Sequence, residues 1–409
     1  MPALSGWPEE LQLGFLESRA AELIAAAIGG GPSRAPRQVQ LQHRPGAGIS
    51  ALYELADGGG FIGITTEPAR DAAGTVRIEV PADAEAIDRG APDAPLVVSL
   101  WRHPHDPKLP GLPLATMAEE VERQWGDGDG LRRLETVTYR PLRRAVVRAE
   151  FATPAPLVHT RRVYLKVMRA GLSEGLHRRH SLLYDAGLPV PRPLGAPVND
   201  VVALAEAPGD PLSRLIQHNG ATSLPPGKLV ALLDLLPDGV RGLPRRPAWS
   251  DRLPRYASAA AVALPEHAER IARLERRLSG LFAATDRGPV VPTHGDFYEA
   301  NILMRGNDVS GLLDVDGVGP GHRVDDLACL LGHIGVLPAV DTRYTHVPEA
   351  LDHFGGAFAE QVDARALWAR AAGVAVSLVA GARTPGSPGW NSDAVGRLAA
   401  AEELADRAN

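Results

Sequence analysis

The sequence predicts an α+β fold with separate lobes, rich in strands near the N-terminus and in helices towards the C-terminus. Three observations predict it. Short β-rich runs separated by Gly, Pro and Asp fill most of the first half, and helical periodicity dominates after residue 211. The chain has 409 residues, which corresponds to roughly two or three domains. We expect an N-terminal α+β cap over residues 1–110, a sheet-containing lobe over 111–206 and a helical lobe over 207–409.

The expected cap begins with a helix over residues 9–28, where apolar residues recur at helical spacing. Short alternating runs after it predict an antiparallel sheet on which this helix packs. The predicted strands are 39–43, 49–55, 61–65, 76–80 and 96–101.

The expected second lobe has a helix before its sheet and a helix within it, at 114–125 and 173–186. Its predicted strands are 134–139, 145–151, 162–167 and 201–206. Within the helical last part, three more segments have strand character, at 290–293, 301–304 and 311–315.

The composition excludes several classes of protein. The 43 Lys and Arg residues face 49 Asp and Glu residues, for a formal net charge of −6, so no basic excess favours nucleic-acid or membrane-surface binding. No apolar run has membrane-spanning length, and residues 1–10 have no positive region or long apolar core, so we expect neither a membrane span nor export. The one cysteine, Cys329, forms no internal disulfide and is expected to be a small buried apolar residue. We expect a cytoplasmic protein.

The segment 293–303 carries the strongest chemical signal. Asp296 stands five residues before Asn301, and a short apolar run then leads to Asp314. This spacing describes a loop and a hairpin that bring oxygen ligands to one point. Magnesium prefers carboxylate and amide oxygens and shares its other positions with waters and substrate phosphates. Since acidic groups alone would repel ATP, a magnesium ion is part of the prediction.

The pattern resembles the phosphotransfer core of protein kinases. With Gly295 after His294, and Asp326 downstream, it more closely resembles the aminoglycoside phosphotransferase family, including its maltokinase-like and glucosamine-kinase-like sugar kinases. The resemblance covers residues 134–409 and implies a bilobal protein-kinase-like fold.

By this resemblance, Asp296 is the catalytic carboxylate that orients the acceptor hydroxyl and takes its proton. Asn301 and Asp314 bind Mg²⁺, and Asp326 braces the loop from the following helix. The resemblance also makes His294 a site candidate. Asp316 and His322 are further candidates, for which a hydrogen-bonded structural role stays equally open.

Lys166 is the second anchor of the prediction. Only three residues are lysine, namely Lys108, Lys166 and Lys228, so arginine is the usual surface cation of this chain. A compact ammonium within an apolar strand suits the phosphates of ATP, as the strand lysine of kinases does. The alternative is an exposed lysine on an edge strand.

Two features depart from the kinase pattern. Glu174 is the acid available to pair with Lys166, but it stands about one helical turn before the usual place, where His177 lies; a first-turn acid favoured by the helix dipole is the alternative. The phosphate-covering turn at 140–144 holds arginines and no glycine. Those arginines either contact phosphates or are simply solvated.

The remaining candidates are placed by order along the chain. By the resemblance, backbone groups of Glu206 and Ala207 form the hinge that binds adenine, and Trp390 could stack on a sugar face, with packing as its alternative. A zinc site at His103, His105 and Asp106 is not favoured, because a fourth ligand is missing.

We therefore expect an enzyme that uses ATP and Mg²⁺ to phosphorylate a hydroxyl of a small molecule, a sugar or amino sugar. An aminoglycoside antibiotic is the first alternative acceptor. Because aminoglycosides are cationic, such an acceptor would favour acidic residues around its binding pocket. The sequence alone cannot place candidates such as Asp352 and Asp363 in that pocket. The second alternative is an inactive nucleotide-binding pseudokinase.

Overall fold

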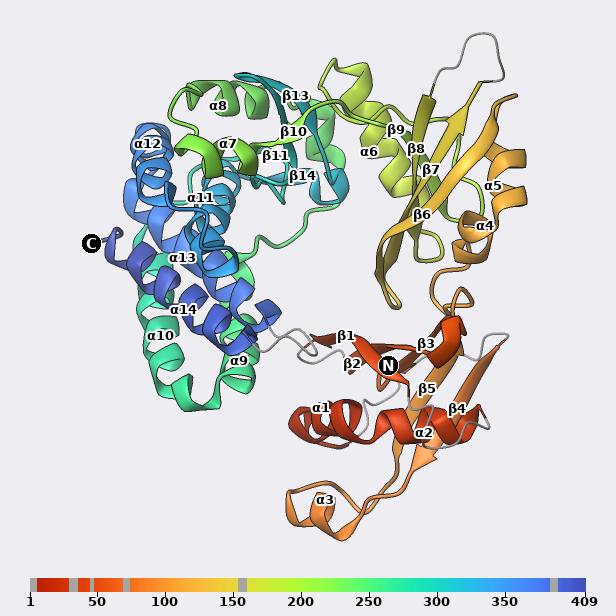
Figure 1. The fold of residues 1–409 in the computed structure, drawn as a ribbon. Coiled ribbons are helices and arrows are strands. Elements are labelled where there is room, and N and C mark those ends of the chain that lie inside the picture. Colours follow the sequence, from red (N-terminus) through yellow and green to blue (C-terminus); the bar gives the residue numbers. More distant parts are fainter. Residues whose placement is uncertain (1–5, 29–35, 45–47, 69–73, 154–159, 383–388) are drawn as a thin grey trace. The chain divides into compact units, whose positions relative to one another are not determined.

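The computed structural model describes residues 6–28, 36–44, 48–68, 74–153, 160–382 and 389–409. They form two compact units, which we describe separately. Unit 1 comprises the described residues up to Glu174 together with Leu194–Ala205, and unit 2 comprises Gly175–Pro193 and the described residues from Glu206 onward. The predicted α+β class is confirmed, since unit 1 holds two antiparallel sheets and unit 2 is mainly helical (Figure 1).

The first sheet of unit 1 has five antiparallel strands in the order β1-β2-β3-β5-β4. Its bounds are β1 Arg37–Arg44, β2 Gly48–Glu54, β3 Phe61–Thr65, β4 Thr75–Val80 and β5 Leu96–Arg102. The predicted helix 9–28 is two helices, α1 Glu9–Ser18 and α2 Ala20–Ala27, because φ at Arg19 is −113° and interrupts the helical path. The short helix α3 spans Ala84–Asp88.

The second sheet of unit 1 has four antiparallel strands in the order β6-β7-β8-β9. Its strands are β6 Gly130–Arg140, β7 Arg144–Ala152, β8 Thr160–Met168 and β9 Val201–Ala205. The predicted helix 114–125 is split at Met117, whose backbone is extended, into α4 Leu112–Thr116 and α5 Ala118–Trp125. The helix α6 spans Ser173–Asp185.

A buried polar network joins these two parts of unit 1. Asp106 is 4 % exposed, and its carboxylate accepts hydrogen bonds from the Tyr139 hydroxyl at 2.8 Å, the Leu142 N–H at 2.7 Å and the Lys108 N–H at 2.9 Å. The indole of Trp101 on β5 donates to the Tyr139 hydroxyl at 3.0 Å. Asp106 therefore fixes the turn between β6 and β7 through the N–H of Leu142.

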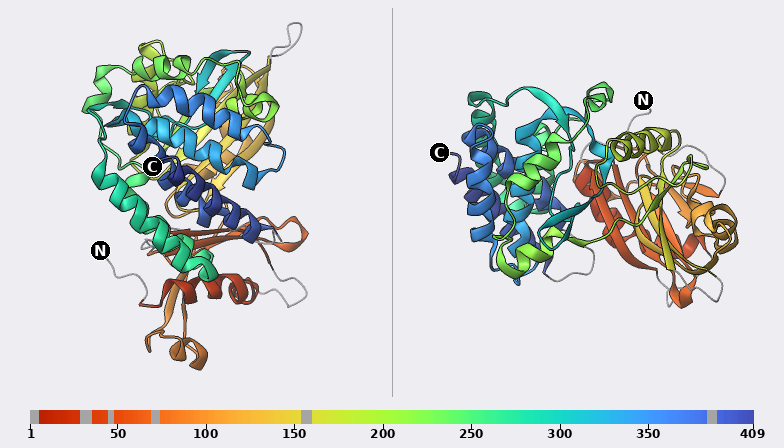
Figure 2. Two further views of the ribbon diagram at one scale, coloured as in Figure 1. Left: turned by 90° about the vertical axis from the view of Figure 1, so that its left-hand side faces the viewer. Right: turned by 90° about the horizontal axis from the view of Figure 1, so that it is seen from above.

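Unit 2 is built around the helix α11, Arg323–Val340, which is buried along most of its length and contacts α12, α13 and α14 (Figures 1 and 2). Most of α6 also belongs to unit 2, and its other α-helices are α7 Leu212–Asn219, α8 Gly227–Asp234, α9 Leu253–Ala263, α10 Ala268–Ala284, α12 Val347–Ala359, α13 Ala364–Val379 and α14 Trp390–Asp406. Among the described residues, no helix combines the length and apolar character that a membrane crossing requires.

Two small sheets of unit 2 position the candidate site. β11, Val290–Thr293, pairs with β14, Gly319–His322, and β12, Ile302–Arg305, pairs with β13, Asp308–Leu312. The two-residue strand β10, Asp210–Pro211, extends the second of these sheets. The loop between β11 and β12 contains Asp296.

Replacing Asp106 by alanine should lower the free energy of unfolding by about 2–4 kcal/mol, because three buried donors lose their acceptor. Denaturant unfolding of the full chain, followed by circular dichroism, measures this change. The exposed Asp93→Ala variant of the same unit is the control and should change little. Equal stability of the two variants would show that the network does not support unit 1.

Candidate active site

The loop that carries Asp296 is held in place by the first turn of α11. The carboxylate of Asp326 accepts hydrogen bonds from the backbone N–H groups of His294 and Gly295, each at 2.8 Å. Asp326 is 1 % exposed, and burial raises the pKa of its carboxyl to about 7. An irregular loop leaves backbone N–H groups without partners from secondary structure. The Asp326 side chain satisfies two such groups in this loop.

His294 holds the backbone of Asp296 from the N-terminal side. Its Nδ1 accepts a hydrogen bond from the Asp296 N–H at 3.3 Å, and its Nε2 lies 3.0 Å from the carbonyl oxygen of Leu313. A carbonyl can only accept, so Nε2 carries the proton and the ring is neutral. Burial favours the same state, because it lowers the pKa of His294 to about 4.

Asn301 holds Asp296 from the other side. Its Nδ2 donates to the carbonyl oxygen of Asp296 at 3.0 Å. Both backbone polar groups of Asp296 are therefore bound by side chains of the same loop. Since the amide nitrogen of Asn301 is engaged in this bond, its Oδ1 is the atom with which it can bind a further group.

Asp314 follows β13 and lies next to this loop, since the Leu313 N–H donates to the Asn301 carbonyl at 2.8 Å. The strand predicted over 311–315 ends earlier, at Leu312, and Asp314 adopts φ 55° and ψ 52°. This left-handed conformation costs a residue with a side chain about 1–2 kcal/mol, and such strain concentrates at functional sites. Burial and the charges of Asp296 and Asp314 together raise the pKa of Tyr298, so the two carboxylates converge on one region.

The oxygen donors of this region fit a magnesium ion. Asn301 offers an amide oxygen and Asp314 a carboxylate, and magnesium retains several waters besides such ligands. Asp316 lies in the 3₁₀ turn Val315–Gly317, and its charge, like that of Asp314, acts on the His294 ring. Among the described residues, no group of three or more His, Cys, Asp or Glu side chains is arranged to hold a metal ion. A site here would thus depend on Asn301.

The loop has a glycine, Gly295, where protein kinases have arginine, because the loop passes very close to Gly317. The φ of Gly295 is +79°, and a Cβ at this position would lie 2.6 Å from the carbonyl oxygen of Gly317. The loop and the turn after Asp314 therefore approach each other at van der Waals limits. Only a residue without a side chain allows this approach.

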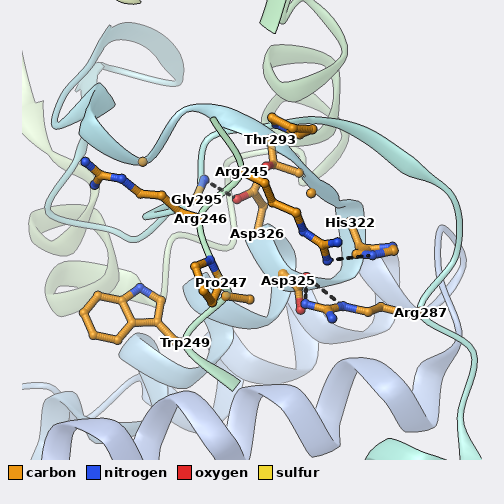
Figure 3. Close-up of a pocket in the computed structure, with 14 residues that line it drawn as sticks. Arg245, Arg246, Pro247, Trp249, Arg287, Thr293, Gly295, His322, Asp325 and Asp326 are labelled. Carbon is orange, nitrogen blue, oxygen red and sulfur yellow. Dashed lines mark hydrogen bonds and ion pairs between the residues drawn. The ribbon is translucent and has the colours of Figure 1, made fainter. Parts of the chain in front are cut away.

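Trp249 lies against Asp296, and sequence reasoning missed it. Its Nε1 donates to Oδ1 of Asp296 at 3.2 Å, and its ring centroid is 5.8 Å from that of Tyr256 on α9. Trp249 lines a pocket of unit 2 together with Gly295 and His322 (Figure 3). The sequence separation of 47 between Trp249 and Asp296 hides this contact from any local pattern. A tryptophan in a non-helical Arg- and Pro-rich segment was the one available signal.

Several other predicted residues of unit 2 make contacts within the fold, and His322 also lines the Trp249 pocket. His322 is the residue before α11 and its Nδ1 bonds the Gly288 carbonyl at 2.8 Å. Trp390 begins α14 and is not among the described residues that line the Trp249 pocket. Cys329 is buried in α11, as expected. Asp352 pairs with Arg407 at 2.7 Å, and Asp363 caps α13.

Lys166 lies in the middle of the second sheet of unit 1. It stands opposite Val146 of β7 and Val202 of β9 and is 7 % exposed, so the alternative of an exposed edge-strand lysine is wrong. Glu174 is exposed in the first turn of α6. The phosphate role of Lys166 and its pairing with Glu174 stay predictions.

One arginine of the glycine-free turn of unit 1, Arg143, is not simply solvated, whereas Arg140 is exposed. Arg143 forms an ion pair with Glu67, with 2.6 Å between the nitrogen and oxygen atoms, and Lys108 pairs with the other oxygen of Glu67 at 3.0 Å. Glu67 itself is buried. Glu206 and Ala207 open the segment of unit 2 that follows β9, and their adenine contact stays a prediction.

Glu299 is a buried acid in the same loop as Asp296. It is 5 % exposed, and among the described residues its Oε2 has no hydrogen-bond partner. Burial, assisted by the charge of Asp296, raises the pKa of Glu299 to about 7. This carboxyl therefore gains or loses a proton near neutral pH.

This loop, with the fixed backbone of Asp296 and its oxygen donors, has the features that the sequence predicted for a phosphotransfer site. A family model described as the phosphotransferase enzyme family matches residues 156–374, which is more than half of the chain. The protein belongs to this family, and the predicted family and enzyme class are confirmed. No curated protein matches the chain.

Solved structures similar to this chain include aminoglycoside and ethanolamine kinases. A thermostable mutant of aminoglycoside phosphotransferase APH(4)-Ia with ADP and hygromycin B is 13% identical, with a TM-score of 0.48, over 71% of this chain and 98% of that one. An ethanolamine kinase from Plasmodium vivax is 12% identical, with a TM-score of 0.46, over 69% and 87%. A choline/ethanolamine kinase family protein from Mesorhizobium loti is 16% identical, with a TM-score of 0.46, over 72% and 95%.

Replacing Gly295 by alanine should lower the free energy of unfolding by about 1–3 kcal/mol and reduce activity, because the new Cβ displaces the loop that carries Asp296. Gly306→Ala is the matched control, since Gly306 also has positive φ, at +57°, but a Cβ there meets nothing within 4 Å. Thermal unfolding and steady-state kinetics measure both variants. If the two variants lose activity equally, the contact with Gly317 is not what matters.

Stability should fall as the pH rises through the range in which Glu299 titrates. The unfolded carboxyl has a pKa near 4.5 and the folded one about 7, so the native state holds more protons between these values. Relative to Glu299→Gln, we expect the wild type to lose up to about 3 kcal/mol of unfolding free energy between pH 4.5 and 8. Urea unfolding at several pH values measures this. Exposed Glu403→Gln is the control, and parallel pH curves for wild type and Glu299→Gln would contradict the prediction.

Proposed function

We propose that this phosphotransferase uses ATP and Mg²⁺ to transfer the γ-phosphoryl group to a hydroxyl of a sugar or amino sugar. One observation carries the proposal: Asp296 has both backbone polar groups fixed, and its carboxylate meets the indole of Trp249. Indole rings offer a flat apolar face with a polar edge, which suits the face of a sugar ring beside a hydroxyl-binding carboxylate. The neighbouring Tyr256 ring enlarges this aromatic surface.

In this proposal, the chain contributes positioning and electrostatics. Asp296 orients the acceptor hydroxyl and takes its proton, while the Trp249 N–H keeps the carboxylate in one orientation. Asn301 and Asp314 are the residues that would hold Mg²⁺, which when bound neutralises charge on the phosphates. Phosphoryl transfer asks for little covalent chemistry from the protein, so a rigid loop is well suited to it.

The ATP-binding part of the proposal rests on unit 1 and on the segment after β9. Lys166 would bind phosphates, and backbone groups of Glu206 and Ala207 would bind adenine. Lys166 is 7 % exposed and lies on a strand with neighbours on both sides, which supports a specific role over that of a surface cation. We also propose that residues 1–110 form a cap on a lobe over 111–206, with 207–409 as the helical lobe.

Asp296→Asn should lower kcat by about 10²- to 10⁴-fold, because the amide cannot take the hydroxyl proton. The assay incubates the protein with Mg-ATP and a panel of sugars, amino sugars and aminoglycosides, and detects phosphorylated product by mass spectrometry. Asp308→Asn, at an exposed position on β13, is the control and should retain activity.

Two outcomes would contradict the proposal. Turnover that persists in Asp296→Asn would remove Asp296 from the chemistry. If Mg-ATP raises the melting temperature but no acceptor is phosphorylated, the chain is a nucleotide-binding regulator instead, because a ligand selective for the folded state still stabilises it.

A further inference from the structure

The segment between α8 and α9 brings positive charge to the site of Asp296. Residues 241–255, which run into the start of α9, contain five arginines and one acid, Asp251: the arginines are Arg241, which pairs with Asp238 at 3.2 Å, Arg245, Arg246, Arg252 and Arg255. That acid is already engaged, since it pairs with Arg287 at 2.9 Å and accepts from the Ala248 N–H. It therefore does little to neutralise the arginines of its own segment.

Arg245 and Arg246 are consecutive but point to opposite sides of this segment (Figure 3). Arg245 extends to His322, with 3.5 Å between its Nη2 and the His322 Nε2. Arg246 extends to the side on which the ring of Trp249 lies. The Trp249 indole bonds the Asp296 carboxylate, so Arg246 extends to the side of the segment on which this partner of Asp296 lies, and Arg245 extends to the opposite side.

The surroundings of Arg246 are cationic as well. Burial and then the charge of Arg246 lower the pKa of Arg179 on α6; Asp316 opposes them, and Arg178 adds the smallest effect, which also lowers the pKa. Within the described residues, Arg246 forms no ion pair with an acid. The Arg179 Nε is bound to the Val318 carbonyl at 3.0 Å, so this guanidinium is fixed in place.

We propose that the acceptor carries an anionic oxygen group, a carboxylate or phosphate, which Arg246 binds while the acceptor hydroxyl faces Asp296. A guanidinium forms paired hydrogen bonds with such groups. The same charge repels a polycationic acceptor and so selects against it. The inference rests on the proposed function and narrows its acceptor class to acidic sugars or comparable hydroxy acids, away from amino sugars and aminoglycosides.

A matched series of acceptors and a pair of variants test this. Glucose, glucuronate, glucose 6-phosphate and glucosamine share one ring and differ in charge. We expect the wild type to have its highest kcat/KM with an anionic member. Arg246→Ala should lower kcat/KM for the anionic members by about 10- to 100-fold and leave glucose within about twofold. Arg245→Ala is the control, because Arg245 is the neighbouring residue and has the same charge, but its side chain points to the opposite side of the segment from Arg246.

The other outcomes overturn the inference in distinguishable ways. If Arg246→Ala lowers kcat equally for all acceptors or raises the KM for ATP, Arg246 serves the phosphates of ATP and not an acceptor group. A wild-type preference for glucosamine also overturns it, while the proposed function stands.

If no member of the series is phosphorylated, the proposed function fails for this series, and calorimetry on the ADP-loaded protein decides the inference. Glucuronate or glucose 6-phosphate should then bind the wild type and Arg245→Ala about 10-fold or more tightly than Arg246→Ala. Equal binding by all three proteins, or binding by none, overturns it.

Discussion

The candidate site depends on one constraint, the need of an irregular loop for hydrogen-bond partners. The buried carboxylate of Asp326 meets this need for His294 and Gly295, and the side chains of His294 and Asn301 meet it for Asp296. The neutral His294 ring also binds the Leu313 carbonyl and so connects the loop to the residue before Asp314. Once these bonds form, the backbone at Asp296 and at the residue before Asp314 is held in place, and this positions the two carboxylates.

The parts that sequence reasoning predicted are those that depend on neighbours along the chain. Alternation and turn residues located most strands, and β3 and β11 match their predicted bounds. The spacing of Asp296 and Asn301 predicted a single loop between two strands, as in the structure. The errors were local interruptions: Arg19 and Met117 break helices that periodicity alone extended. Periodicity does not register one residue that leaves the helical conformation while the apolar pattern continues.

The parts that sequence reasoning missed depend on contacts between distant residues. Trp249 reaches Asp296 across 47 residues, and Asp106 reaches the N–H of Leu142 across 36. Neither contact leaves a periodic pattern, because each is made by one side chain after the fold has formed. Arg246 was missed for the same reason: its direction, opposite to that of Arg245, follows from the path of a non-helical segment. Roles of this kind emerge from tertiary structure only.

Asp106, Asp326 and Asp296 fall into two groups by what their carboxylates bind. Asp106 and Asp326 are buried and use their carboxylates to accept from backbone N–H groups, which makes them part of the framework. In Asp296 the backbone is bound by other side chains, and the carboxylate is partly exposed beside an aromatic ring. Since a carboxylate that holds the framework cannot also accept a substrate proton without loosening it, chemistry is expected from the second group. Spacing in the sequence does not separate these groups, because Asp296 and Asp326 both belong to the same motif; burial and bonding do.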